Sequence, residues 1–385
     1  MKTRSVFFFM LLFGAWLTSS WILHAQRIDI PRTVRGVEVF SIKGWWANHY
    51  LWPYLPDKST VHPLPGLHQP DKHQTPEEML SLIRILKQYG SGLDVIQYNP
   101  NPENSDHNEL LSSGYLTHRD LTNRPFFLSY EHANATRFKP ADDNGIPKDM
   151  NDPHNRQVFR EDIDWMVRKI ILPNQSRYVT FGGRALIYLW SVAQMSGDFA
   201  TLLDEMRATY PVAFLGSVNS LYLPTDLENS RSFRSLDGFM EYALFPVATP
   251  EEKVSGVVEY SRMKSMYTRS YFRIRAALKQ FESETKRKYL LVPTMQFAFD
   301  DRKWPGRRNI PMYAQSRAEV EDFAKLLRES MDAGALSPVG PFSVINEYFE
   351  GNASAPSRCF HETFDTPSRF IGCGLARLEI LKKYF

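Results

Sequence analysis

Apolar residues recur along the chain at two alternating spacings, one typical of helices and one typical of buried strands. Thr75 followed by Pro76 gives the clearest helix start, because Thr caps a first turn and Pro fits its opening position. Gly90 ends that helix. The predicted strands are residues 37–42, 93–98, 125–130, 184–190, 212–218, 238–245, 290–299 and 341–346. The predicted helices are residues 76–89, 160–172, 199–210, 257–289, 317–333 and 374–384.

Eight predicted strands alternate with helices, without a linker-like change in composition, and this indicates one α/β domain. A domain of this length with eight βα units is typical of a (β/α)8 TIM barrel. A doubly wound open sheet is the alternative, but no Gly-rich phosphate-binding loop follows the first predicted strand. Residues 44–74, rich in Trp and Tyr, form a long aromatic first βα loop in this prediction. We therefore expect residues 26–385 to form a single barrel domain.

The first residues differ from the rest of the chain. Lys2 and Arg4 precede an apolar run over residues 6–23, and the small residue Ala25 follows it. This order predicts a secretory signal peptide over residues 1–25, and hence a secreted, periplasmic or cell-surface protein. The run is at the lower edge of membrane-spanning length, so a retained signal anchor is the alternative and would make the membrane a partner.

Composition and charge narrow the class of partner. The chain has 385 residues, is 43% hydrophobic and carries a formal net charge of +3, which is typical of a folded globular protein. The mild basicity, without a concentrated Lys/Arg stripe, argues against nucleic acid as the main partner. Residues 286–288 form the densest basic cluster, and we interpret it as the solvated end of a helix.

The spacings of cysteine and histidine residues bear on disulfide and metal chemistry. Cys359 and Cys373 form one disulfide in an exported protein or remain two buried thiols, and the sequence leaves both readings open. Four histidines share the aromatic loop, but their spacings match no helical ligand pair: His49, His62, His68 and His73. No metal and no cofactor is therefore expected.

Polar and acidic residues follow several predicted strands, and a barrel places its reactive groups at these carboxyl ends. Glu347 and Glu350 follow the last strand and are the candidate catalytic pair. In carbohydrate chemistry one acid protonates the departing oxygen, a second group is nucleophile or base, and aromatic rings stack on sugars. The candidate substrate-binding residues are Trp45, Trp46, Tyr50, Tyr130, Glu131, Glu241, Asp300, Asn346 and Tyr348.

Each candidate also has a structural interpretation. Glu347 and Glu350 would then pair with neighbouring Arg or Lys, and Glu131 and Glu241 would make structural hydrogen bonds. Asp300 belongs to a D-D-R-K run that is equally typical of a loop salt-bridge network. The aromatic loop would pack as a satellite core over the barrel mouth. No G-x-S-x-G elbow and no P-loop occurs in the sequence, so serine-nucleophile and nucleotide chemistry find no support.

Residues 346–351, N-E-Y-F-E-G, resemble the Asn-Glu-Trp-His-Glu-Gly signature of glycoside hydrolase family 99, the endo-α-mannosidase and endo-α-mannanase family, and its family 99-like relatives. Residues 293–302 resemble the family's seventh-strand segment, and residues 126–131 its third-strand segment. The resemblance covers most of the barrel in order of elements, but only the eighth-strand motif is specific. It implies a (β/α)8 retaining glycosidase without a metal.

The resemblance also implies roles for the two glutamates. Glu347 would assist attack of the sugar's own 2-hydroxyl on the anomeric carbon through a 1,2-anhydro intermediate, and Glu350 would be general acid and then general base. The proximity of two carboxylates drives such a splitting of their pKa values. The sequence departs from the signature at Tyr348 and Phe349 and lacks the acidic residue that follows the Gly. These departures bear on the sugar subsites, and so on the substrate.

The leading hypothesis is an exported glycoside hydrolase that cleaves α-linked oligosaccharides or polysaccharides, with mannose-containing glycans as the candidate substrate. One alternative is a barrel that binds carbohydrate without catalysis. Another is a protein of surface-polysaccharide assembly, like some family 99-like proteins.

Overall fold

The structure is a computed structural model, and the chain divides into two compact units, Met1–Pro31 and Arg32–Phe385. The predicted signal segment, residues 1–25, and both cysteines lie outside the described residues. Within the described part of the chain, no helix is long and apolar enough to cross a bilayer. The structure describes residues 30–49, 55–59, 63–98, 110–131, 137–139, 148–217, 231–241, 249–255, 258–299, 313–314, 316–332, 340–344, 357 and 374–385.

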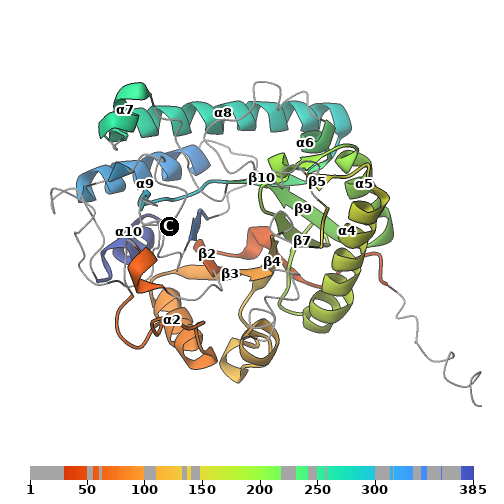
Figure 1. Cartoon of the computed structure of the whole chain (residues 1–385), viewed down its shortest axis with the longest axis horizontal. Helices are drawn as coiled ribbons and strands as arrows, with labels where there is room; N and C mark the ends of the chain where they lie inside the picture. The colour runs from red at the N-terminus through yellow and green to blue at the C-terminus, as the bar shows by residue number, and fades with distance from the viewer. Residues whose placement is uncertain are drawn as a thin grey trace, which may run out of the picture. The chain divides into compact units, whose positions relative to one another are not determined.

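A parallel barrel forms the centre of the second unit (Figure 1). Its strands follow the order β11-β10-β9-β7-β4-β3-β2-β14. Thr294, just after β11, bridges Phe342 of β14 in parallel, which joins the two ends of the sheet. The predicted (β/α)8 barrel is confirmed. The barrel strands are β2 (Trp45–His49), β3 (Ser91–Tyr98), β4 (Phe126–Tyr130), β7 (Arg184–Leu189), β9 (Val212–Gly216), β10 (Gly238–Met240), β11 (Leu290–Val292) and β14 (Phe342–Val344).

Helices surround the strands, and α8 runs alongside α9 (Figure 1). Thr75 caps α2 as predicted: its Oγ1 accepts from the Glu78 amide at 3.2 Å, and Glu78 Oε2 accepts from the Thr75 amide at 2.9 Å. Ser316 and Glu319 make the same reciprocal pair before α9. The helices are α2 (Pro76–Gln88), α4 (Pro153–Trp165) with its π-helical continuation Met166–Ile171, α5 (Phe199–Thr209), α6 (Arg231–Ser235), α7 (Pro250–Ser255), α8 (Tyr260–Thr285), α9 (Arg317–Asp332) and α10 (Ala376–Tyr384).

The first predicted strand is wrong in position. β1 (Val37–Glu38) is short, leads into a 3-10 turn and pairs with β6 (Val179–Phe181) off the barrel path. The first barrel strand is instead β2, inside the predicted aromatic loop. Its sequence W-W-A-N-H is not a plain apolar run, because Asn48 and His49 are buried polar residues.

The remaining strands are short pairs outside the barrel path. β6 turns into β7 through Gly182 and Gly183, whose φ values are +59° and +73°. Two positive φ values in succession are the geometry of a tight type I′ hairpin, which Gly adopts without strain. The other pairs are β5 (Lys148–Asp149) with β8 (Met195–Ser196), and β12 (Ala298–Phe299) with β13 (Tyr313–Ala314).

A buried charge network ties β2 and β3 to the segment before β4. Asp94 accepts hydrogen bonds from Tyr115 Oη at 2.8 Å and from Arg124 Nε at 2.9 Å, and its Oδ1 lies 3.0 Å from His49 Nε2. Burial opposes ionisation of Asp94, yet the charges of Arg124 and His49 hold its pKa well below the usual range. The carboxylate is therefore charged and fully partnered on the outer face of the barrel.

We expect Asp94→Asn to destabilise the fold by about 3–5 kcal/mol, because Arg124 would remain buried without its counter-charge. Chemical denaturation with urea measures the change in free energy of unfolding. Since the folded-state pKa is lowered from 3.8, the contribution is fully present above about pH 4 and is lost as pH falls further.

The matched control is Asp57→Asn, which removes an exposed carboxylate with no partner among the described residues. Equal stability of the Asp94→Asn and Asp57→Asn variants at pH 7 would contradict the role given to the network.

Candidate functional site

Contacts between aromatic rings show which side chains point into the barrel. The Trp46 ring of β2 meets the Phe127 ring of β4 at 5.5 Å, although β3 separates these strands in the sheet. Tyr188 of β7 and Phe342 of β14, also not neighbours, lie 6.1 Å apart. Side chains of strands that are not neighbours meet in this way only inside the barrel, so these four side chains point inward. Because side chains alternate along a strand, Ser129 shares the inward face of Phe127, two residues away.

A row of inward polar side chains lies near the carboxyl ends of the strands. In register, Gln97 of β3 pairs with Ser129 of β4, and Ser129 pairs with Tyr188 of β7. Asn48 is on the inward face of β2, two residues after Trp46. All four side chains are buried. Polar groups are costly inside a barrel unless they are partnered, and this end of a TIM barrel is where such groups meet ligands.

Two carboxylates join this row from the strand ends. Glu131 directly follows β4 and Glu241 directly follows β10, and both are buried. Burial raises the pKa of the Tyr188 phenol well above its ordinary value, and the charges of Glu241 and Glu131 raise it further. Both acids therefore lie near one inward-facing phenol, although β4 and β10 are not neighbours.

Contacts from adjacent strands hold Glu241 in place. Ser217, just after β9, donates from Oγ to Glu241 Oε1 at 2.6 Å. Thr294 donates from Oγ1 to the backbone carbonyl of Glu241, from the side where the barrel closes. A carboxylate with one oxygen fixed by a hydroxyl has a defined orientation, which an electrostatic or hydrogen-bonding role toward a ligand requires.

Three buried polar atoms of β2 have no hydrogen-bond partner among the described residues, and two of them are on the inward face, whereas His49 Nδ1 is on the outward face. The two inward atoms are Trp46 Nε1 and Asn48 Oδ1. Most buried polar atoms in proteins are hydrogen-bonded, so a donor and an acceptor left open on one inward face favour a site that a polar ligand fills. Carbohydrate hydroxyls supply both kinds of partner.

Trp45 and Tyr130 are corrected as substrate-binding residues, and Trp46 is corrected only as part of an open stacking platform. Trp45 faces outward, and its Nε1 donates to the Tyr89 carbonyl at 2.8 Å. Trp46 faces inward but is packed on Phe127, and both Trp side chains are 0% exposed. Neither is part of an open stacking platform. Tyr130 points out of the barrel. On that outer side the centre of its ring lies 5.8 Å from the centre of the Phe159 ring of α4.

The other predicted residues divide into two groups. Glu131 and Glu241 lie at the carboxyl end of the barrel, as described above. β14 ends at Val344, which pairs with Asn48 of β2, so this last strand ends beside the polar row. The candidates outside the described residues are Tyr50, Asp300, Asn346, Glu347, Tyr348 and Glu350, and their roles stay predictions.

Sequence reasoning missed most of the inward row. Asn48, Gln97, Ser129, Tyr188 and Ser217 were not among the candidates. A signal was present for Ser129, which is the single polar residue near the end of the otherwise apolar run 125–130, whereas Gln97 shares its strand with the polar Asp94. An isolated polar residue in a buried parallel strand indicates a position near the end that bears the site.

Behind Glu131, a second polar cluster lies between β4 and α4. Asp162 Oδ2 accepts from Tyr130 Oη at 2.6 Å, and Asp162 Oδ1 accepts from Arg137 Nη1 at 2.5 Å. Burial raises the pKa of Asp162 from 3.8 to about 6, against the opposing effects of Tyr130 and Arg137. This carboxyl supports the outer side of the strand that leads into Glu131.

Comparisons with known proteins give structural matches. No known family model matches the sequence, and no curated protein matches it significantly. The structure of the GH99 endo-α-mannosidase from Bacteroides thetaiotaomicron in complex with bis-tris-propane is similar over 89% of this chain and 96% of that chain, with 14% identity and a TM-score of 0.55. A glycoside hydrolase-like protein is similar over 95% of this chain and 98% of that chain, with 13% identity and a TM-score of 0.57.

At these identities the similarity is one of fold. Both matches extend over nearly the full length of the compared chains. The family 99 resemblance in the sequence and the structural similarity to a family 99 enzyme thus agree on a (β/α)8 barrel.

The raised pKa of Asp162 predicts a pH-dependent stability difference between the wild type and Asp162→Asn. The folded state binds the proton more tightly than the unfolded state, so wild-type stability falls as pH rises from about 4 through about 6. The variant lacks this titration. Urea denaturation at pH 4 and pH 7 should show wild type losing up to about 3 kcal/mol relative to the variant. A constant difference across this range would contradict the assignment.

Proposed function

We propose that this chain is a glycoside hydrolase of the family 99-like type, which cleaves α-linked glycans with retention at the carboxyl end of its barrel. The observation that carries the proposal is the convergence of Glu131, Glu241 and the polar row at that end, where β14 also ends. The N-E-Y-F-E-G motif begins two residues after the end of β14 in the sequence.

In the proposed first step, Glu347 removes the proton from the sugar's 2-hydroxyl. The 2-oxygen attacks the anomeric carbon, the glycosidic bond breaks, and Glu350 protonates the departing oxygen. In the second step, Glu350 takes a proton from water as the water oxygen attacks the anomeric carbon. The 1,2-anhydro ring opens, and Glu347 returns the proton to the 2-oxygen. Two inversions at one carbon give net retention.

The described side chains have supporting roles in this proposal. Positive charge develops at the anomeric centre in the transition state of glycoside cleavage. The charges of Glu131 and Glu241, buried at the barrel end, would stabilise it without a cost of reorganisation. Asn48 and Gln97 would bind sugar hydroxyls. Ser217 would hold Glu241 in the orientation that faces the sugar.

Substrate and location are also part of the proposal. The motif resemblance and the endo-α-mannosidase with the same fold favour mannose-containing glycans. The apolar segment over residues 6–23 favours export, with residues 1–25 as signal peptide and residues 26–385 as the catalytic domain. An extracellular or periplasmic location suits an enzyme that acts on oligosaccharides or polysaccharides.

A second candidate is a barrel that binds glycans through the buried polar row without cleaving them. Glycan-array binding with no sugar released on long incubation would select that candidate. A requirement for an activated-sugar donor would instead select a role in surface-polysaccharide assembly.

We expect Glu347→Gln and Glu350→Gln each to lower kcat/KM on α-mannan oligosaccharides by about 10³-fold, because Gln keeps the shape but transfers no proton. Release of reducing ends measures the rate, and circular dichroism checks folding. Glu259→Gln, which changes an exposed glutamate before α8, is the matched control. Normal turnover by either active-site variant would reject the catalytic pair.

Asn48→Ala should raise KM about tenfold and leave kcat nearly unchanged, because an open acceptor that binds a sugar hydroxyl contributes equally to ground and transition states. Steady-state kinetics on the same oligosaccharides separates the two constants. An unchanged KM would show that Asn48 does not face the substrate.

A further inference from the structure

A pocket lies at the opposite end of the barrel from the candidate functional site. Its volume is about 480 Å³, within the range of about 300–1,000 Å³ typical of small-molecule sites. Arg184 begins β7, and Asp237 directly precedes β10. Arg287 and Lys288 precede β11, so the pocket lies where these parallel strands begin. Its charged lining residues are Arg184, Asp204, Arg207, Asp237, Arg287 and Lys288.

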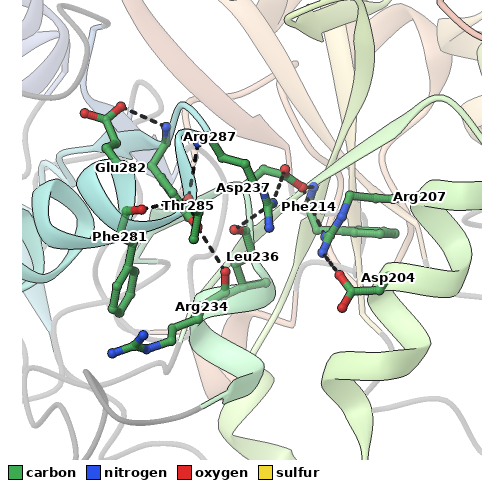
Figure 2. A network of polar contacts seen from close by, with 11 residues as sticks. Asp204, Arg207, Phe214, Arg234, Leu236, Asp237, Phe281, Glu282, Thr285 and Arg287 are labelled. Carbon is green, nitrogen blue, oxygen red and sulfur yellow. Dashed lines mark hydrogen bonds and ion pairs between the residues drawn. The ribbon is translucent and has the colours of Figure 1, made fainter.

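The buried carboxylate of Asp237 is among the lining groups of this pocket. Figure 2 shows the polar contacts around it. Asp237 Oδ1 accepts from Arg287 Nη2 at 2.6 Å. Asp237 Oδ2 accepts from the Phe214 amide at 2.8 Å and from Arg207 Nη1 at 3.3 Å. Both oxygens are thus engaged within the protein. This network fastens β9, β10, α5 and the end of α8 together, a structural role typical of the amino-terminal face of a barrel.

The same network gives the pocket a charge-balanced floor, because Arg207 and Arg287 are matched by Asp204 and Asp237. Arg207 also pairs with Asp204, and its side chain is only 6% exposed. Arg287 donates to the Leu236 carbonyl at 3.3 Å as well as to Asp237. The interpretation of residues 286–288 as a solvated helix end therefore holds for Lys286, which caps α8 with a φ of +59°, but is wrong for Arg287.

Two further basic side chains of the lining are not part of this network. Arg184 and Lys288 are exposed, and neither makes a side-chain hydrogen bond or ion pair with any residue that the structure describes. The lining has four basic and two acidic side chains, which leaves a net charge of +2. A concave surface with this excess favours an anion of matching charge.

The backbone positions Arg184 rigidly at this pocket. The Gly182–Gly183 hairpin pairs Phe181 with Arg184, and Gly182 itself lines the pocket. A Cβ at Gly182 would meet no atom within 4 Å, so the space beside the turn is open. The Arg184 side chain therefore starts from a paired strand end and lines the pocket.

We propose that this pocket binds a small dianion that carries a phosphate or sulfate group. Arg184 and Lys288 contact the anion directly and supply the net charge of +2, while Arg207 and Arg287 remain paired with Asp204 and Asp237 in the floor. A planar guanidinium matches the geometry of phosphate and sulfate oxygens, and a lysine supplies a compact charge beside it. The site is separate from the glycan site and does not depend on the proposed hydrolase activity.

Isothermal titration calorimetry of the full chain tests the proposal, with inorganic phosphate, inorganic sulfate and glucose 6-phosphate as probes and acetate as the monoanion. Ionic strength is held constant with sodium chloride, because surface electrostatics are screened by salt. We expect saturable binding of one dianion per chain and weaker binding of acetate. Tighter binding of glucose 6-phosphate than of inorganic phosphate identifies a phosphorylated sugar, and equal binding identifies the free anion. Both results support the proposal.

The Arg184→Ala/Lys288→Ala double variant should bind phosphate and sulfate at least about tenfold more weakly, because two direct charge-assisted contacts are lost. The matched control is Lys43→Ala/Lys279→Ala, which removes two exposed lysines elsewhere and should bind as the parent does. Thermal melting without added anion checks that both variants fold. Absence of saturable dianion binding, or equal affinity in the two double variants, would overturn the proposal.

Discussion

Closure of the sheet is the constraint on which both ends of this molecule depend. Phe342 of β14 donates to the Pro293 carbonyl at 2.8 Å and accepts from the Met295 amide at 2.8 Å, while β14 pairs with β2 on its other side. Closure gives the barrel an inside. Only then do Trp46 and Phe127 meet across the interior, and only then do the strand ends that bear Glu131 and Glu241 face a common space.

Much of the fold was predictable because local signals agree with the tertiary structure. Thr75 caps α2 as its sequence indicates, and the apolar run of β3 is buried nearly throughout. β2 was missed because Asn48 and His49 interrupt its apolar pattern. His49 is buried against Asp94, 45 residues away, and local patterns do not reveal such a distant partner.

The sequence predicted the strand ends at which the candidate site lies, but not which side chains of those strands point into the barrel. Strand ends are visible in the sequence, so Glu131 and Glu241 were identified as candidates. The sequence shows that side chains of β4 alternate between two faces, but it does not show which face points inward. Tyr130 is on the outer face, where its ring packs against Phe159 of α4. Arg287 was misinterpreted for a related reason, since Asp237, its partner, lies 50 residues away.

The stereochemistry of cleavage tests the central claim most directly. Proton NMR follows the anomeric signals while the wild-type protein acts on an α-linked manno-oligosaccharide. We expect the α-anomer of the new reducing end to form first and then equilibrate, because two inversions occur at the anomeric carbon. First formation of the β-anomer, or no cleavage of any α-linked glycan, would contradict the central claim.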